Sequence, residues 1–135
     1  MDPQPLQMDP ESVIKSKMTE YISLYGLFVD PLVKLSIAEQ TLILLNALIN
    51  KSEKTQKDED LKKRIEDLWK KHEDAILDYY DREADPNWKD TWLHATEIMR
   101  ECVDIALRYG FISPKVFAID PSTLNRMLDG IGWRR

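Results

Sequence analysis

The stretch Leu42-Ile43-Leu44-Leu45-Asn46-Ala47-Leu48-Ile49 decides the fold. Seven of its eight residues are apolar, and it holds no glycine or proline. A helix built from it is apolar nearly all round, and such a helix is normally buried on most sides. The sequence therefore predicts a central core helix, which opens at Ser36 with Glu39 three residues on, in the pattern of a capping box.

Further helices are predicted on both sides of this core segment. Aspartate accepts hydrogen bonds from the free amides at a helix start, and proline suits the first helical position. Asp-Pro pairs stand at Asp9-Pro10, Asp85-Pro86 and Asp120-Pro121, and a fourth pair, Asp30-Pro31, is expected to open a shorter turn. The predicted ranges are 10–25, 60–83, 86–109 and a short one over 121–129. The expected fold is all-α: a compact helical bundle of four longer helices plus one short C-terminal helix.

The same helix-start and helix-end signals predict the domain organisation. Residues 1–9 are expected to form a flexible N-terminal segment, and residues 10–135 a single helical domain. Residues near 50–59 are charged and polar without an apolar anchor, which favours a linker. Gly26 and Gly110 follow predicted helices, where glycine commonly adopts the left-handed conformation that ends a helix.

Composition excludes several functional classes. The single cysteine, Cys102, cannot form an internal disulfide, and no signal peptide is recognisable near Met1. The uninterrupted aliphatic run from Leu42 to Leu45 is too short to cross a membrane. We therefore expect a cytoplasmic protein without membrane association. The four glycines form no phosphate-binding loop, and no Gly-x-Ser-x-Gly turn is present, so neither a cofactor nor an enzymatic activity is expected.

One acidic constellation favours a different hypothesis, a metal site. His94, Glu97, Glu101 and Asp104 are spaced by three, four and three residues and so share one helix face. Glu101 and Asp104 also form half of the paired acidic motif with which all-α nucleotide pyrophosphatases hold magnesium. The other half, a Glu-x-x-Glu pair upstream, is missing. We interpret the stripe as a solvated helix face and keep a metal-dependent nucleotide hydrolase as a second alternative.

A nucleic-acid-binding module is the first alternative. The net charge of −5 argues against a generic nucleic-acid binder, but local basic groups exist. One is Lys62-Lys63-Arg64, which is interleaved with acids. The other consists of Arg126, Trp133, Arg134 and Arg135, where an aromatic beside arginines can stack on a base and hold phosphate.

Aromatic placement supports the leading hypothesis. Trp88 and Trp92 lie one turn apart near a predicted helix start, and an exposed aromatic there could anchor a partner protein. Together with the missing catalytic motifs, this predicts a non-enzymatic interaction protein, an adaptor, regulator or assembly subunit. It would act through a helical surface on a protein partner or on a second copy.

Overall fold

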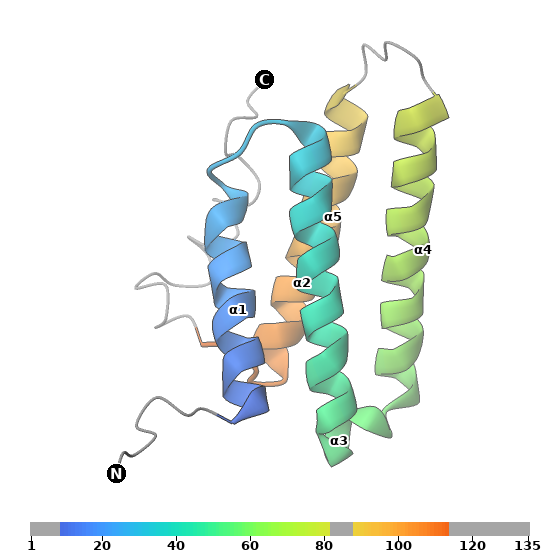
Figure 1. Ribbon diagram of the computed structural model, residues 1–135. Helices are drawn as coiled ribbons and strands as arrows, with labels where there is room; N and C mark the ends of the chain where they lie inside the picture. The colour runs from blue at the N-terminus through green and yellow to red at the C-terminus, as the bar shows by residue number, and fades with distance from the viewer. Residues whose placement is uncertain (1–8, 82–87, 114–135) are drawn as a thin grey trace.

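A computed structural model describes residues 9–81 and 88–113. These residues contain helices and no strand, which confirms the all-α prediction. The helices are α1 (Pro10–Tyr25), α2 (Pro31–Lys51), α3 (Glu53–Gln56), α4 (Glu59–Asp81) and α5 (Trp88–Arg108). The four long helices lie side by side with alternating direction (Figure 1). The predicted flexible segment, apart from Asp9, and the predicted helix over 121–129 lie outside the described residues.

Aspartate caps set the starts of α1 and α2. The Asp9 carboxylate accepts a hydrogen bond from the Ser12 amide at 2.8 Å, as predicted. Asp30 does the same for the amides of Leu32 at 2.8 Å and Val33 at 3.2 Å, with Pro31 at the first helical position. The expected start at Ser36 is therefore wrong. The Asp30 cap lies six residues before Ser36, and the residues between the two, Pro31 to Leu35, already belong to α2.

The two glycines that follow long helices behave differently. Gly110 has a φ of 76°, the left-handed conformation predicted after α5. Gly26 has a φ of −75° and stays in the right-handed helical region. The left-handed stop predicted at Gly26 is thus wrong, because the Asp30-Pro31 pair a few residues later already redirects the chain into α2.

The segment predicted as a charged linker near 50–59 is largely ordered. It contains the last residues of α2 and the short α3. The buried Thr55 hydroxyl donates to the Ile49 carbonyl at 2.7 Å and so ties α3 to the end of α2. Asp58 then caps α4 through the Leu61 amide at 3.0 Å, and it also accepts a hydrogen bond from the Tyr109 hydroxyl at 3.0 Å.

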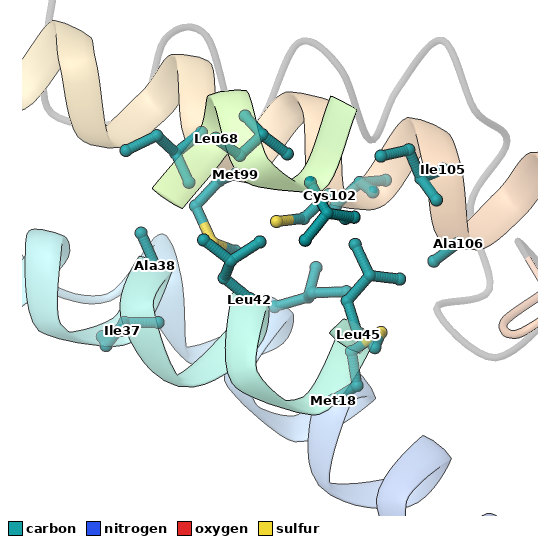
Figure 2. Close-up of a cluster of buried hydrophobic side chains, with 14 of the residues drawn as sticks. Met18, Ile37, Ala38, Leu42, Leu45, Leu68, Met99, Cys102, Ile105 and Ala106 are labelled. Carbon is teal, nitrogen blue, oxygen red and sulfur yellow. The ribbon is translucent and has the colours of Figure 1, made fainter. Parts of the chain in front are cut away.

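The core forms around α2, which packs against α1, α4 and α5. Met18, Leu42, Leu45, Met99 and Cys102 come from three helices, are 0% exposed and meet in the interior (Figure 2). Within the described part of the chain, α2 is the one helix with the length and composition of a membrane span, at a mean hydropathy of 1.6. Half of that window is buried against the other helices, so packing in the bundle accounts for its apolar character.

Candidate interaction surface

The acidic stripe of α5 faces basic residues of α4 along what we call the charged seam, formed by Arg64, Lys71, Glu97, Glu101 and Asp104. Arg64 Nε donates to Glu101 Oε1 at 3.0 Å, and its Nη2 donates to Asp104 Oδ2 at 3.1 Å. Lys71 Nζ lies 3.5 Å from Glu97 Oε1. The carboxylates are therefore neutralised by the neighbouring helix and fasten α4 to α5.

The metal-site alternative receives no geometric support along the seam. His94 lines a shallow groove of about 470 Å³ between α4 and α5, together with Lys71 and Glu97. In the described part of the chain, no group of three or more His, Cys, Asp or Glu side chains is placed to hold a metal ion. A cation at Glu101 and Asp104 would have to displace the Arg64 guanidinium.

The predicted basic patch is only partly a free surface. Arg64 belongs to the charged seam, and Lys62 lies 3.9 Å from Glu59 in a loose ion pair on α4. Lys63 is exposed. The C-terminal residues of the nucleic-acid alternative lie outside the described residues: Arg126, Trp133, Arg134 and Arg135. The described residues thus leave Lys62 and Lys63 as a small basic group interleaved with acids.

The structure describes the side chain of only one of the two candidate anchors, Trp92. Trp92, predicted as a partner anchor, is 3% exposed and belongs to the core. A buried ring cannot contact a partner in this conformation. Trp88 is the first residue of α5, but its side chain lies outside the described residues.

Trp92 lies beside a buried lysine that the sequence analysis missed. Lys34 of α2 is 0% exposed, and its Nζ donates to the Tyr25 carbonyl, the last of α1, at 2.8 Å. Nζ also lies 3.9 Å from the centroid of the Tyr25 ring and 5.2 Å from that of Trp92. Carbonyl, helix terminus and aromatic faces all favour a cation. Burial nevertheless lowers the pKa of the Lys34 ammonium to about 8.

Two other reactive side chains are also buried. Cys102 is 0% exposed, and burial raises the pKa of its thiol well above the ordinary value. His72 is 5% exposed and packs edge-on against Trp69, with ring centroids 6.1 Å apart. Its Nε2 makes no hydrogen bond to any described residue. Neither side chain reaches solvent for nucleophilic or acid–base chemistry.

The connection between α1 and α2 carries a run of exposed apolar side chains. Leu27 is 74% exposed, Val29 63%, Phe28 40% and Val33 37%, and we call these four residues the apolar turn. The connection lies at one end of the bundle, together with the last residues of α4 and the first of α5 (Figure 1). We call this end the turn end. Two further exposed apolar residues, Leu77 and Tyr80, lie near the end of α4.

The apolar turn is held by rigid neighbours. Asp30 caps α2 immediately after it, and the Leu27 amide donates to the Leu24 carbonyl at 2.9 Å. Below it, Lys34 joins the end of α1 to α2, and the Tyr25 hydroxyl lies 2.7 Å from Thr96 Oγ1 of α5. Hydrogen bonds therefore hold both ends of the connection that carries the exposed side chains.

Comparisons with protein-family models, with curated proteins and with solved structures find no match to this chain. The geometry of the surface is therefore the basis on which a function can be proposed.

Proposed function

We propose that this protein is a non-enzymatic interaction module that binds a protein partner through the apolar turn. The observation that carries the proposal is the exposure of Leu27, Phe28 and Val29, three consecutive apolar residues, on a structured connection. Single exposed apolar residues are common on protein surfaces, but contiguous ones mark interaction sites. Each Å² of apolar surface removed from water contributes about 25 cal/mol, so covering these side chains favours binding.

The charged seam supports the non-enzymatic part of the proposal. A hydrolase would need the carboxylates of Glu101 and Asp104 free to hold a metal ion. Both instead accept hydrogen bonds from Arg64. The thiol of Cys102 is enclosed by the core, which suits a packing role.

Site-specific photo-crosslinking in the cells that make the protein tests the proposal. A photoreactive phenylalanine analogue replaces Phe28 in one variant and Val13 in the other. Val13 is a matched control, because it is 44% exposed and lies in the first turn of α1, at the opposite end of the bundle. We expect discrete adducts from position 28 alone, and their loss when Leu27 and Val29 are also changed to serine.

Equal crosslinking from both positions would contradict the proposal, as would adducts at position 28 that survive the two serine substitutions. An adduct with nucleic acid in place of protein would favour the nucleic-acid alternative. We do not expect the substitutions at positions 27, 28 and 29 to unfold the protein, since changes to exposed side chains usually alter the free energy of unfolding by less than about 0.5 kcal/mol.

A further inference from the structure

We propose that Lys34 is the positioning residue of the apolar turn: its ammonium group caps the end of α1 from α2 and so fixes the path of the connection between the two helices. The inference rests on the proposed function and adds the side chain that prepares this surface for its partner. It is carried by the way in which α1 ends, compared with the way in which α5 ends.

Helix α5 ends with backbone groups. Gly110 takes the left-handed conformation, with a φ of 76°. The amides of Phe111 and Ile112 then donate to the Ala106 carbonyl, at 2.7 and 3.3 Å. Carbonyls in the last turn of a helix are commonly satisfied in this way. The end of α5 is thus closed by the residues that directly follow it.

Helix α1 ends with a side chain of the next helix. Gly26 stays in the right-handed region, at a φ of −75°, so it does not form a left-handed glycine cap. The carbonyl of Tyr25, the last residue of α1, instead accepts a hydrogen bond from Lys34 Nζ at 2.8 Å. Because Lys34 belongs to α2, this bond ties together the two ends of the connection formed by residues 26–30.

The ammonium group lies where three helices meet. Lys34 is 0% exposed, and its Nζ lies 3.9 Å from the centroid of the Tyr25 ring and 5.2 Å from that of Trp92 on α5. The Tyr25 hydroxyl lies 2.7 Å from Thr96 Oγ1, also on α5. Aromatic faces and the carbonyl end of a helix both attract a cation. Lys34 therefore joins the end of α1 and the start of α2 beside α5, next to the apolar turn.

A buried ammonium group is a costly way to fill this position. Burial lowers the pKa of Lys34 to about 8, so the folded protein disfavours the charged form. Replacement of a buried charged group by an apolar one of similar size is often neutral or stabilising. A methionine would fill a similar volume without a charge to desolvate. Stability alone therefore does not account for the lysine, whereas a role in fixing the connection does.

A fixed connection favours binding because the partner does not have to order it. The exposed side chains of Leu27, Phe28 and Val29 lie on the segment whose ends Lys34 ties together. Ordering a mobile loop on association lowers affinity, and a loop already held in its bound conformation avoids this cost. Loss of the Lys34 hydrogen bond should therefore leave the apolar side chains in place in the sequence but weaken binding through them.

Two substitutions on α2 test the inference. Lys34→Met removes the donor to the Tyr25 carbonyl and keeps the approximate length of the side chain. Thr41→Val is the matched control, because Thr41 is also 0% exposed and its hydroxyl donates to the Ile37 carbonyl at 2.9 Å, within α2 itself. Each variant thus loses one buried hydrogen bond, and the bond lost in Lys34→Met is the one that joins two helices.

The first measurement is the backbone order parameter of residues 27–29, obtained from NMR relaxation of the full-length protein. We expect values of about 0.85 in the wild type and in Thr41→Val, and below about 0.6 in Lys34→Met. Unchanged order parameters in Lys34→Met would overturn the inference and leave the proposed function standing.

Thermal unfolding of the same proteins at pH 7 separates positioning from stability. The melting temperature of Lys34→Met should stay close to that of Thr41→Val, because removal of the buried charge offsets the lost hydrogen bond. A Lys34→Met protein that does not fold would overturn the inference, since the lysine would then be needed for the fold itself.

The second measurement repeats the crosslinking from position 28 in both variants. We expect the yield of adducts to be about tenfold lower in Lys34→Met than in Thr41→Val, because the connection is no longer held for the partner. Equal yields would overturn the inference, while the adducts themselves would still support the apolar turn as the binding surface. If position 28 gives no adduct even with Lys34 present, the proposed function fails and the inference fails with it.

Discussion

The charged seam and the apolar turn are opposites in how they use their residues. In the seam, the Arg64 guanidinium lies 3.0 and 3.1 Å from two carboxylates of α5, so oppositely charged side chains neutralise one another. In the turn, Leu27 is 74% exposed and Val29 63%, although neither has any chemistry beyond an apolar surface. The difference indicates that the charged stripe holds the bundle together, whereas the apolar residues are available to a partner.

This comparison leads to opposite rankings for stability and for binding. Core and seam residues should matter for unfolding and little for the partner. Residues of the apolar turn should matter for the partner and little for unfolding.

The largest effect on stability is expected in the core that supports both regions. Leu42→Ala should lower the free energy of unfolding by about 2–5 kcal/mol, because it leaves a cavity beside Met18 and Met99. Urea unfolding followed by circular dichroism measures the change. Ile43→Ala is the matched control on the same helix, since Ile43 is 42% exposed. Similar losses for the two variants would contradict the packing of α2.

The next effect concerns Lys34, which joins α1 to α2 below the apolar turn. Its folded pKa of about 8 lies below that of an unfolded lysine. Between about pH 8 and 10.4 the unfolded chain therefore binds a proton that the folded chain lacks, and the contribution of Lys34 to stability rises with pH. Burial raises the pKa values of Cys102 and Tyr25, whose contributions fall in the upper part of this range.

A comparison of wild type with Lys34→Met isolates the lysine from these opposing groups. We expect the stability of the wild type relative to the variant to increase from pH 7 to pH 10, by at most about 3 kcal/mol, since one pKa unit corresponds to about 1.4 kcal/mol. Urea unfolding across this range measures it. A difference that stays constant with pH would show that the Lys34 ammonium is not buried.

A smaller loss is expected when the charged seam is broken. Arg64→Ala removes two hydrogen-bonded ion pairs and leaves Glu101 and Asp104 as neighbouring like charges. Because Arg64 is about one-third exposed, solvent screens these pairs, and we expect a loss of only about 1 kcal/mol. Lys63→Ala, an exposed neighbour, is the control. No loss of stability in Arg64→Ala, together with new metal-dependent thermal stabilisation, would revive the metal-site alternative.

The smallest effect on stability belongs to the apolar turn itself. Leu27→Ser with Phe28→Ser should change the free energy of unfolding by no more than about 0.5 kcal/mol, because both side chains already contact water. Thermal unfolding followed by circular dichroism gives the value. A loss above 1–2 kcal/mol, roughly the cost of a buried apolar group, would mean that these residues pack inside the protein.

Local sequence signals predicted much of the fold. The aliphatic run at 42–49 identified the core helix, the Asp9 cap placed α1, and Gly110 takes the left-handed conformation expected after α5. The start of α2 was missed because Ser36 and Glu39 form a plausible cap inside the helix that Asp30 opens. The short α3 was missed because Thr55 is fixed by the Ile49 carbonyl, a contact that spacing alone does not reveal.

The candidate site was harder to predict, for a physical reason. Hydrophobicity does not say whether a residue is covered, so Trp92 was a candidate partner anchor although it lies on the apolar side of its helix, and no signal marked Leu27, Phe28 and Val29 as exposed. Their exposures of 3% for Trp92 and 74% for Leu27 depend on how three helices pack. Lys34 did leave a signal, since it lies four residues before Ala38 on the buried stripe of α2. A charge at that position indicates a buried partner such as the Tyr25 carbonyl.

The most direct test of the central claim is an NMR titration of the full-length protein with an amphipathic helical peptide, because both the apolar turn and the groove between α4 and α5, which Lys71 and Asp74 line, could attract it. We predict amide shift changes concentrated at residues 26–33, with few at Lys71, Glu97 and Glu101. Changes that follow the groove between α4 and α5, with residues 26–33 unaffected, would contradict the assignment of the apolar turn as the interaction surface.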